Sequence, residues 1–578
     1  MIIIPALVTF AKPKTMAEFP LFVILCFVAT SILKNENSNP IVSTIYGKIE
    51  GFHYTTPSGF ETEIFLGIPY AAPPIGSLRF EKPLPPTPWT STLQAKAFGS
   101  ACATLPKFSP PTASEDCLFM NIIKPATSSP DTNGYPIMLW IHGGGFLVGS
   151  SANYPFEETA ERIVKNGVIF ISINFRQGAF GFFSDVDSDA AGNYGLWDQI
   201  QALKFIQKIA KEFDGNPKNV TLFGQSSGAI AVSLLSLSPK TENLFQRTIH
   251  MSGSSNQRLE LQPKNSNVSL QLANVLGCDS FKNTKNCLKT KTAVELQNGM
   301  ASVIQYLFEG DGTNTIGFWP RADGELISNI SYEKLIQRAS KRDVFIGINS
   351  QEFYVFALVS PFSNPNAKYF PITPAKAAYF SAQDFTDIVN NVFATKEIFG
   401  NKHQKVADKI INFYKNQTHY NSSWNFYLQI YAQLLSDIMF NIRLIREAKM
   451  RAEAGENVYY YVYNYVPESM NNDLYEGSGH SRELHNLFGQ VFGLPIVPLI
   501  GEAATVQKTF VNLFINFAKT GTPSSGTLHV PSVTNSSIPN IQINSISLIQ
   551  QNLWKDRIEF WDNIAAKYGY DWIENRKL

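Results

Sequence analysis

The sequence has almost no net charge and no strongly biased segment. It holds 48 lysine and arginine residues against 47 aspartate and glutamate residues. This balance creates no field that would attract nucleic acid or an anionic membrane surface. No internal repeat, low-complexity linker or break in composition follows Asn39. With 44% hydrophobic and 16% charged residues, the chain is typical of a globular protein rather than a disordered or coiled-coil one.

Long apolar runs are also missing after the first forty residues. The run Pro20–Leu33 follows Lys12 and Lys14 and ends near small residues, which predicts a signal peptide within residues 1–33. It is shorter than the roughly 20 residues of a membrane-spanning helix. A start at Met16 would remove both lysines, and an uncleaved signal anchor is the alternative. We therefore expect a secreted or secretory-lumen protein without stable membrane insertion.

Cysteine is scarce, with five residues in the chain. Cys26 lies in the signal segment, and the others form two pairs close in sequence, Cys102 with Cys117 and Cys278 with Cys287. An oxidising compartment would join each pair in a disulfide worth about 2–4 kcal/mol. Four free thiols in a cytosolic chain are the alternative. Sequons fit the secretory route and predict glycosylation at Asn267, Asn329, Asn416, Asn421 and Asn535.

Short apolar runs alternate with longer helical stretches, which predicts a large, mostly parallel central sheet with helices on both faces. The stretch Tyr194–Phe213 has apolar residues at three- and four-residue spacing and is predicted to be a crossover helix. We expect a single α/β domain over residues 39–578. The predicted strands are Ile137–Ile141, Val168–Ile173, Val220–Phe223, Thr248–Met251, Val344–Ile348 and Val458–Tyr463.

The clearest chemical motif begins where the predicted strand Val220–Phe223 ends. The pentapeptide GQSSG at residues 224–228 follows it, and the helix-forming run Ala229–Leu237 comes next. This is the G-x-S-x-G nucleophile elbow in the strand, turn and helix context that it requires. The turn strains the serine, and the flanking glycines let strand and helix approach each other. Ser226 is therefore the candidate nucleophile, with a structural serine in a tight turn as the alternative.

A glycine-rich run directly follows the predicted strand that ends at Ile141. It reads HGGG at residues 142–145. Acyl transfer must stabilise an oxyanion, and the backbone N–H groups of a glycine loop can approach one closely. We predict Gly144 and Gly145 as donors, joined by the N–H of Ser227. His142 is interpreted as structural.

Ser226 needs a base and an acid from elsewhere in the chain. His480 lies in a loop of small residues near the C-terminal end, and His485 is its nearest rival. In the α/β-hydrolase fold, the acid lies between the serine and the histidine in sequence. Glu352 meets this condition in a loop just after the predicted strand Val344–Ile348. Two aspartates are alternatives from spacing alone, Asp323 and Asp343.

Together these motifs make the chain resemble the type-B carboxylesterase and cholinesterase family over nearly its whole length after the signal segment. The resemblance implies the α/β-hydrolase fold, the two disulfides, Glu352 of a G-x-N-x-x-E motif as the acid and His480 of a G-x-x-H-x-x-E motif as the base. Besides the elbow, the matching stretches are Phe65–Phe80, Ser114–Asn121, Trp140–Phe146, Asn193–Gln199, Gly347–Glu352, Gly477–Gly489 and Asn516–Pro523.

Two residues and one loop depart from the family pattern. Gln225 stands where cholinesterases and many carboxylesterases carry glutamate, although juvenile hormone esterases also use glutamine. Phe353 replaces the glycine that usually follows the acid. The Cys102–Cys117 loop has no tryptophan, so it lacks the cation–π platform on which cholinesterases stack choline. The resemblance therefore favours a carboxylesterase over a cholinesterase.

The predicted activity is hydrolysis of carboxylic esters by a broad-specificity serine carboxylesterase, through an acyl-enzyme. The expected partner is a small-molecule ester. No metal or organic cofactor is expected, because the sequence has no HExxH motif and no clustered Cys/His ligand set. The alternatives are a catalytically inactive adhesion or signalling relative, a cholinesterase and an enzyme like juvenile hormone esterase.

Overall fold

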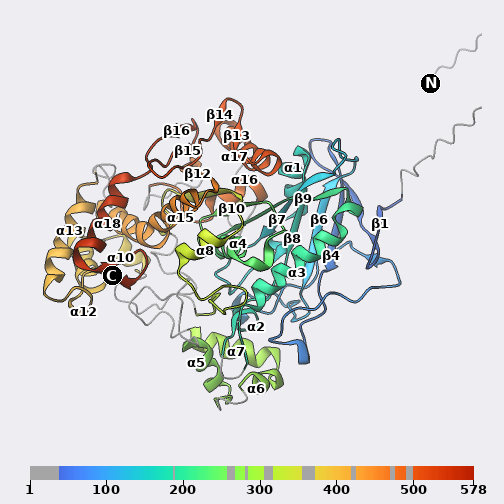
Figure 1. The fold of residues 1–578 in the computed structure, drawn as a ribbon, viewed down its shortest axis with the longest axis horizontal. Helices are drawn as coiled ribbons and strands as arrows, with labels where there is room; N and C mark the ends of the chain where they lie inside the picture. The colour runs from blue at the N-terminus through green and yellow to red at the C-terminus, as the bar shows by residue number, and fades with distance from the viewer. Residues whose placement is uncertain are drawn as a thin grey trace, which may run out of the picture. The chain divides into compact units, whose positions relative to one another are not determined.

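An 11-stranded mixed sheet forms the centre of the computed structural model, and helices lie against it (Figure 1). Residues Asn39–Leu578 make up one compact unit, in agreement with the predicted α/β architecture. The structure describes residues 38–185, 189–256, 267–279, 284–304, 317–354, 372–417, 425–468, 476–489 and 499–578.

The centre of the sheet is parallel, and both of its edges are antiparallel. Neighbours from β8 through β7, β9, β10, β11 and β12 to β15 pair in parallel. Strands beyond β8 and β15 pair antiparallel. In sheet order the strands are β16 (Leu548–Gln550), β15 (Asn540–Ile543), β12 (Asn457–Tyr463), β11 (Asp343–Asn349), β10 (Arg247–Met251), β9 (Gly215–Gln225), β7 (Tyr135–Ile141), β8 (Ile169–Ile173), β6 (Phe119–Pro125), β4 (Glu61–Pro69) and β3 (Phe52–Thr55). All six predicted strands are present.

Short strands and helices complete the described chain. The strands of the small sheets are β1 (Ile41–Thr44), β2 (Gly47–Glu50) and β5 (Leu93–Gln94), β13 (Ser524–Ser525) and β14 (Leu528–His529), and β17 (Tyr570–Asp571) and β18 (Arg576–Lys577). The helices are α1 (Phe156–Arg162), α2 (Gly178–Phe182), α3 (Tyr194–Ile209), α4 (Ser227–Leu237), α5 (Asn267–Val275), α6 (Thr284–Thr290), α7 (Ala293–Ile304), α8 (Tyr332–Arg338), α10 (Pro374–Ala377), α11 (Ala382–Ile388), α12 (Lys396–Phe399), α13 (His403–Lys415), α14 (Phe426–Ser436), α15 (Ile442–Glu453), α16 (His485–Phe488), α17 (Gly501–Thr520) and α18 (Lys555–Tyr568).

Helices cover both faces of the sheet because successive strand residues point to opposite sides. On β11, Val344, Ile346 and Ile348 pack into one apolar cluster with α13, α14 and α15. Phe345 points the other way and packs with α17. Near β7, β8 and β9, α3 and α4 cover the first face, and α1, α16 and α17 cover the second (Figure 1). The predicted two-sided cover is confirmed.

The predicted crossover helix connects β8 to β9. It is α-helical from Tyr194 to Ile209 and continues as a 3₁₀ turn over Ala210–Phe213. The turn ends at Asp214, whose positive φ of 62° leads the chain into β9. Because β7 lies between β8 and β9, the crossover carries the carboxyl end of β9 to the middle of the sheet.

Two disulfides close short loops outside the main sheet. Cys102 is bonded to Cys117, with a Cα–Cα distance of 4.9 Å. Cys278 is bonded to Cys287, with a Cα–Cα distance of 5.6 Å. The first loop leads into β6, and the second joins the segment after α5 to α6.

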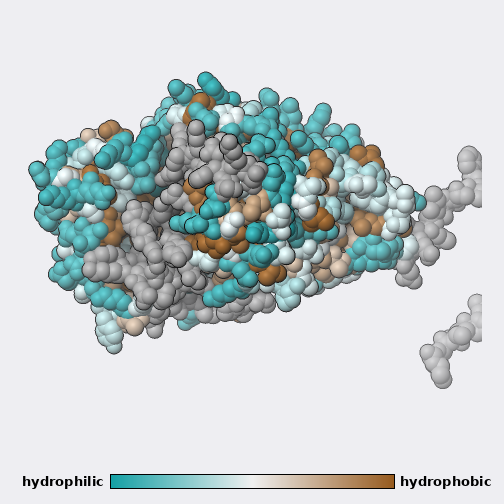
Figure 2. All heavy atoms as spheres, turned by 90° about the horizontal axis from the view of Figure 1, so that it is seen from below, coloured by the Kyte–Doolittle hydropathy of each residue, from teal (hydrophilic) through white to brown (hydrophobic). Residues whose placement is uncertain are grey.

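Hydrophilic side chains cover most of the described surface on the face drawn in Figure 2. The exposed large hydrophobic side chains come from separate parts of the chain, among them Ile45, Tyr379 and Ile500. Single exposed apolar side chains are normal on folded proteins. Within the described ranges, no helix combines the length and the apolarity needed to cross a membrane.

Candidate active site

Ser226 lies in the sharp turn between β9 and α4. Its φ of 57° and ψ of −126° place a non-glycine residue in a conformation that costs free energy. The surrounding backbone holds it there, because Ser226 N donates to Met251 O at 2.8 Å and Ile230 N donates to Ser226 O at 3.0 Å. Ser226 is partly exposed, whereas α4 is buried along its whole length. The turn therefore presents the hydroxyl at the carboxyl edge of the sheet.

The glycines of the elbow are required by close approach of the end of β7. A Cβ on Gly224 would lie 2.6 Å from Ile141 O, and a Cβ on Gly228 would lie 2.1 Å from the same atom. Real side chains do not tolerate such contacts. A Cβ on Gly143 would lie 3.1 Å from Ser226 Cβ, so the HGGG loop packs directly against the serine.

The HGGG loop adopts backbone conformations that favour glycine. Gly144 has a φ of 119° and Gly145 a φ of 65°, in the region that residues with a Cβ rarely adopt. Gly144 O accepts hydrogen bonds from the N–H groups of Leu147 and Val148, both at 3.1 Å, which folds the loop tightly. Ser227 is the first residue of α4, and the first N–H groups of a helix have no partner within it.

His142 lies buried at the base of this loop. Burial lowers its pKa to about 4, although a hydrogen-bond contact between Nδ1 and Gly143 O at 2.8 Å acts in the opposite direction. Its ring stacks on Phe175 with a centroid distance of 4.6 Å. A neutral, stacked imidazole fits the structural role predicted for His142.

His480 and Glu352 come from two loops that hydrogen-bond to each other beyond β11 and β12. Gln351 N donates to Ser478 O at 2.8 Å, and Ser478 N donates to Ser350 Oγ at 2.9 Å. His480 Nδ1 lies 2.6 Å from Glu352 Oε2. Glu352 is fully buried, and His480 is 7% exposed. The structure thus brings together the predicted base and the predicted acid.

The second carboxylate oxygen of Glu352 accepts two further hydrogen bonds. Ser252 Oγ donates to Oε1 at 2.5 Å, and Asn349 N donates to it at 2.6 Å. Ser252 lies in the turn after β10, and its own N–H donates to Gly347 O at 2.7 Å. Bonds to an ionised acceptor are short and strong, so they fix the carboxylate beside His480. Sequence reasoning missed Ser252, which belongs to none of the recognised motifs.

The other ring nitrogen of His480 faces the elbow. His480 Nε2 lies 3.1 Å from Gln225 Nε2, which also donates to Ser481 Oγ at 2.8 Å. Phe440 packs against the imidazole, with ring centroids 5.1 Å apart. The histidine is therefore held beside the residue immediately before Ser226.

Phe353 supports this arrangement rather than disturbing it. The side chain is 5% exposed and belongs to the apolar core below the site. Phe353 N donates to Ser436 Oγ at 2.9 Å, and its ring lies 6.1 Å from that of Phe440. A bulky residue thus follows Glu352 without displacing the carboxylate from His480.

The alternative residues have partners elsewhere. Asp343 lies at the opposite end of β11 from Glu352 and pairs with Arg247 at 3.4 Å. Asp323 Oδ1 accepts backbone N–H groups of the following turn, including that of Ile327 at 3.0 Å. His485 begins α16, and burial lowers its pKa to about 4, helped by the charges of two nearby arginines.

A second buried carboxyl lies close to Glu352. Glu483 Oε2 accepts a hydrogen bond from Asn349 Nδ2 at 2.5 Å, so Asn349 contacts both carboxyl groups. The pKa of Glu483 is raised to about 8, first by burial and second by the negative charge of Glu352. Glu483 is therefore protonated at neutral pH. Burial and contact with Glu352 exist only in the folded chain, and sequence reasoning assigned Glu483 no role.

Glu483→Gln is expected to gain stability relative to the unmodified protein as pH rises from about 5 to 8. The folded protein keeps a proton on Glu483 up to about pH 8, whereas the usual carboxyl pKa is 4.5. The proton on Glu483 contributes its full stabilisation below the pKa of the unfolded chain. This stabilisation is lost as pH rises toward and through the pKa of the folded protein, by up to about 1.4 kcal/mol per pH unit. Glutamine does not titrate and still accepts from Asn349. Thermal melts across this range test the prediction, and a constant difference in Tm would contradict it.

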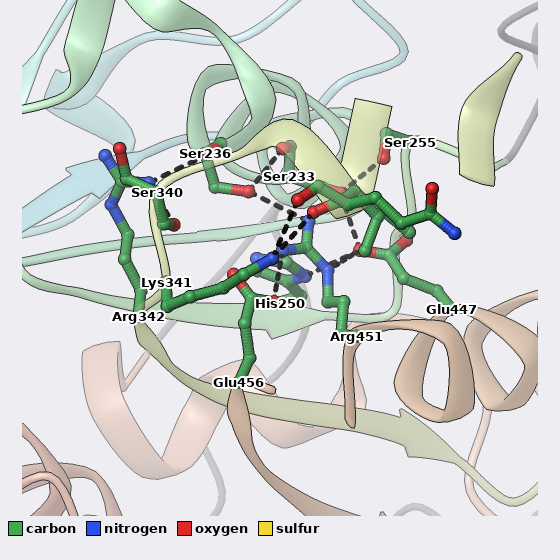
Figure 3. A network of polar contacts seen from close by, with 12 residues as sticks. Ser233, Ser236, His250, Ser255, Ser340, Lys341, Arg342, Glu447, Arg451 and Glu456 are labelled. Atoms are coloured by element: carbon green, nitrogen blue, oxygen red, sulfur yellow. Dashed lines mark hydrogen bonds and ion pairs between the residues drawn. The ribbon is translucent and has the colours of Figure 1, made fainter. Parts of the chain in front are cut away.

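A buried network of charges contacts α4 through Ser233 (Figure 3). Arg451 Nε donates to Glu447 Oε1 at 2.7 Å, and its Nη1 donates to Glu456 Oε2 at 2.9 Å. All three side chains are completely buried. Ser233 on α4 donates to Glu447 Oε1 at 2.7 Å, so the network holds the helix that follows Ser226.

The same network contacts the turn after β10. Ser254 Oγ donates to Glu447 Oε2, and Ser255 Oγ lies 2.5 Å from Ser233 Oγ. Burial alone would raise the pKa of Glu447, but the charge of Arg451 and the bonds from neighbouring side chains outweigh burial and hold this pKa well below its usual value. Because Ser252 lies in the same turn, this turn contacts both the buried charge network and Glu352, the predicted acid.

Three of the five asparagines predicted to be glycosylated are exposed in the described structure. Asn329, Asn416 and Asn535 are exposed, as a glycosylated residue must be. Asn267 is the first residue of α5. Asn421 and the signal segment at residues 1–33 lie outside the described residues.

Comparison with known proteins identifies the family to which the chain belongs. The sequence model described as "Carboxylesterase family" matches residues 38–561. Gut esterase 1 of Caenorhabditis briggsae is 33% identical over 561 residues, covering 93% of this chain and 95% of that protein. Carboxylesterase 1D of Mus musculus is 28% identical over 562 residues, covering 92% and 94%. A solved PNB esterase structure has a TM-score of 0.70 and 26% identity, covering 90% of this chain and 100% of that chain. The chain belongs to the carboxylesterase family and is a carboxylic ester hydrolase with the α/β-hydrolase fold.

Proposed function

We propose that this protein hydrolyses carboxylic esters by a serine mechanism, with Ser226 as nucleophile, His480 as base and Glu352 as the acid that orients the base. The observation that carries the proposal is the 2.6 Å contact between His480 Nδ1 and Glu352 Oε2 beside the elbow. An ionised carboxylate only accepts hydrogen bonds, so it keeps the proton of the neutral ring on Nδ1. Nε2 is then the basic nitrogen, on the side of the elbow.

The proposed reaction has two halves. Ser226 Oγ attacks the ester carbonyl carbon while His480 Nε2 takes the hydroxyl proton, and the C=O electron pair moves onto oxygen. The N–H groups of Gly144, Gly145 and Ser227 would stabilise this oxyanion. The imidazolium then protonates the departing alcohol oxygen as its bond to carbon breaks, leaving acyl-Ser226. Water repeats the sequence with His480 as base and releases the carboxylic acid.

Aromatic side chains next to the glycine loop support a broad range of apolar acyl groups. Phe146 directly follows Gly145, and its ring lies 4.9 Å from that of Phe182 and 5.3 Å from that of Trp319. Trp319 is partly exposed. Apolar walls with a few polar groups are typical of small-molecule sites and discriminate weakly between hydrocarbon groups. The proposed substrates are therefore small carboxylic esters with uncharged acyl groups.

Burst kinetics test the serine mechanism. With p-nitrophenyl butyrate, the purified protein is expected to release close to one equivalent of p-nitrophenol in a burst, and an organophosphate is expected to label one residue per chain, Ser226. Peptide mapping identifies the labelled residue. Absence of both hydrolysis and labelling would favour the inactive adhesion or signalling alternative. Faster turnover of acetylthiocholine than of butyrate esters would favour a cholinesterase, and a preference for juvenile hormone would favour the third alternative.

We also infer that the protein is secreted or enters the secretory lumen, with its signal segment removed. The two disulfides and the exposed sequon asparagines at 329, 416 and 535 support this inference, because disulfides persist in oxidising compartments. Expression in insect cells is expected to yield protein in the medium that loses mass on treatment with an N-glycosidase. Retention of an unglycosylated protein in the cytosol would contradict the inference.

A further inference from the structure

The residue before the nucleophile contacts the base directly. The Gln225 side chain is 1% exposed. Its Nε2 lies 3.1 Å from His480 Nε2 and 2.8 Å from Ser481 Oγ, so one amide group has a partner for each of its two protons. On the other side, the position of a Cβ on Gly143 would be 3.0 Å from Gln225 Oε1. The amide is thus fixed between the histidine loop and the glycine loop.

The direction of the bond between the two side chains follows from the other ring nitrogen. His480 Nδ1 is 2.6 Å from Glu352 Oε2, and a carboxylate can only accept, so Nδ1 carries the proton of the neutral ring. The lone pair of the neutral ring is therefore on Nε2, and the amide N–H of Gln225 donates to it in this structure. Because the ring nitrogen has one lone pair, this bond has to open before Nε2 can take the proton of Ser226. A protonated ring has no lone pair there, and an amide N–H facing its Nε2–H is unfavourable. The contact in the structure thus favours the neutral base.

Among the described residues, the carboxylate in contact with the imidazole is that of Glu352, on the Nδ1 side of the ring. Glu352 faces Nδ1, and Glu483 is neutral at pH 7 because burial raises its pKa to about 8. Arg482, next in the histidine loop, donates to Tyr354 Oη at 3.1 Å. His142 is neutral because burial lowers its pKa to about 4. Of the described residues, Gln225 and Phe440 also contact the ring, and neither side chain carries a charge.

We propose that Gln225 is a positioning residue that keeps His480 in its neutral, basic form, and that it extends ester hydrolysis to lower pH than glutamate at this position would allow. The inference rests on the proposed serine mechanism. Glutamate would place a carboxylate against Nε2, where it favours the protonated ring as an opposite charge at short distance does. Glutamine instead donates to the unprotonated nitrogen. The elbow sequence thereby sets the acid limit of activity.

The test compares Gln225→Glu with the matched variant Gln225→Met, which keeps the side-chain length but has neither donor nor charge. The measured quantity is the ratio of kcat/KM for p-nitrophenyl butyrate at about pH 8.5 to that at about pH 5.5. A shift of the acid limb by about one pH unit corresponds to a tenfold change in activity below it. Gln225→Glu is therefore expected to raise the ratio about tenfold. Gln225→Met is expected to raise it less, in the same direction.

An unchanged ratio in both variants would overturn the inference, as would an equal fall of kcat/KM at every pH, which is what a purely structural role produces. If Gln225→Glu does not fold, judged by its thermal melt, the Gln225→Met ratio alone decides. Organophosphate labelling of the unmodified protein separates this inference from the mechanism beneath it. A protein that labels at Ser226 but shows no shift in either variant refutes only the role of Gln225, whereas a protein that does not label refutes the mechanism.

Discussion

Replacing Ser226 by alanine is expected to lower kcat for p-nitrophenyl butyrate by about 10⁵–10⁶-fold. The variant keeps the proposed oxyanion donors and the imidazole of His480 but has no oxygen that can form the proposed acyl-enzyme. Some rate above water remains, because binding and oxyanion stabilisation do not need the hydroxyl. Alanine also lacks the Oγ that an organophosphate modifies, so labelling is expected to disappear together with the burst.

The matched control for this variant is Thr221→Val on β9. The Thr221 hydroxyl is buried and has no hydrogen-bond partner within the part of the chain that the structure describes, so its loss tests only the effect of a similar change on the same strand. Its kcat is expected to stay within about threefold of that of the unmodified protein. A Ser226→Ala protein that is folded and retains most of its activity would refute the assignment of the nucleophile.

Arg451→Met is expected to lower the free energy of unfolding by about 3–5 kcal/mol. The substitution leaves Glu447 and Glu456 buried without the cation that pairs with both of them. Lys555→Met is the control, because the Lys555–Glu559 pair is exposed and 3.6 Å long and such pairs contribute under about 1 kcal/mol. Urea denaturation measures both changes. Equal losses in the two variants would show that the buried network adds nothing to stability.

The network also predicts how the protein responds to acid. Because the pKa of Glu447 is held well below its usual value, its stabilising effect is present above the unfolded carboxyl pKa and is lost only as pH falls through the lower folded value. Arg451→Met removes the main favourable charge beside Glu447. The stability difference between the variant and the unmodified protein is therefore expected to shrink in strongly acidic solution.

The centre of the fold could be predicted from the sequence because strands buried on both faces are continuous apolar runs. The runs Val344–Ile348 in β11 and Val458–Tyr463 in β12 have this character. The edges could not be predicted in the same way. β16 has three residues, and β4 mixes exposed and buried positions, so pairing with neighbours rather than local pattern defines them.

The residues of the candidate site also differ in how well the local sequence could predict them. Ser226 and the HGGG loop are contiguous motifs whose chemistry is visible in a few adjacent residues. Ser252 and Glu352 are 100 residues apart, and their contact arises only when the ends of β10 and β11 lie side by side in the sheet. The protonation of Glu483 likewise depends on burial and on its distance from another carboxyl. Neither quantity can be read from local sequence.

The turn after β10 links two regions that an engineer would otherwise treat separately. Ser252 holds the carboxylate of Glu352, and Ser254, two residues later, contacts Glu447 in the buried network. A library that replaces the interior charges with apolar residues to gain heat resistance would therefore also act on the turn that holds the carboxylate of Glu352. Selection for thermotolerance in this enzyme should keep residues 252–255 and their partners fixed, and should look for gains in the distant edge strands.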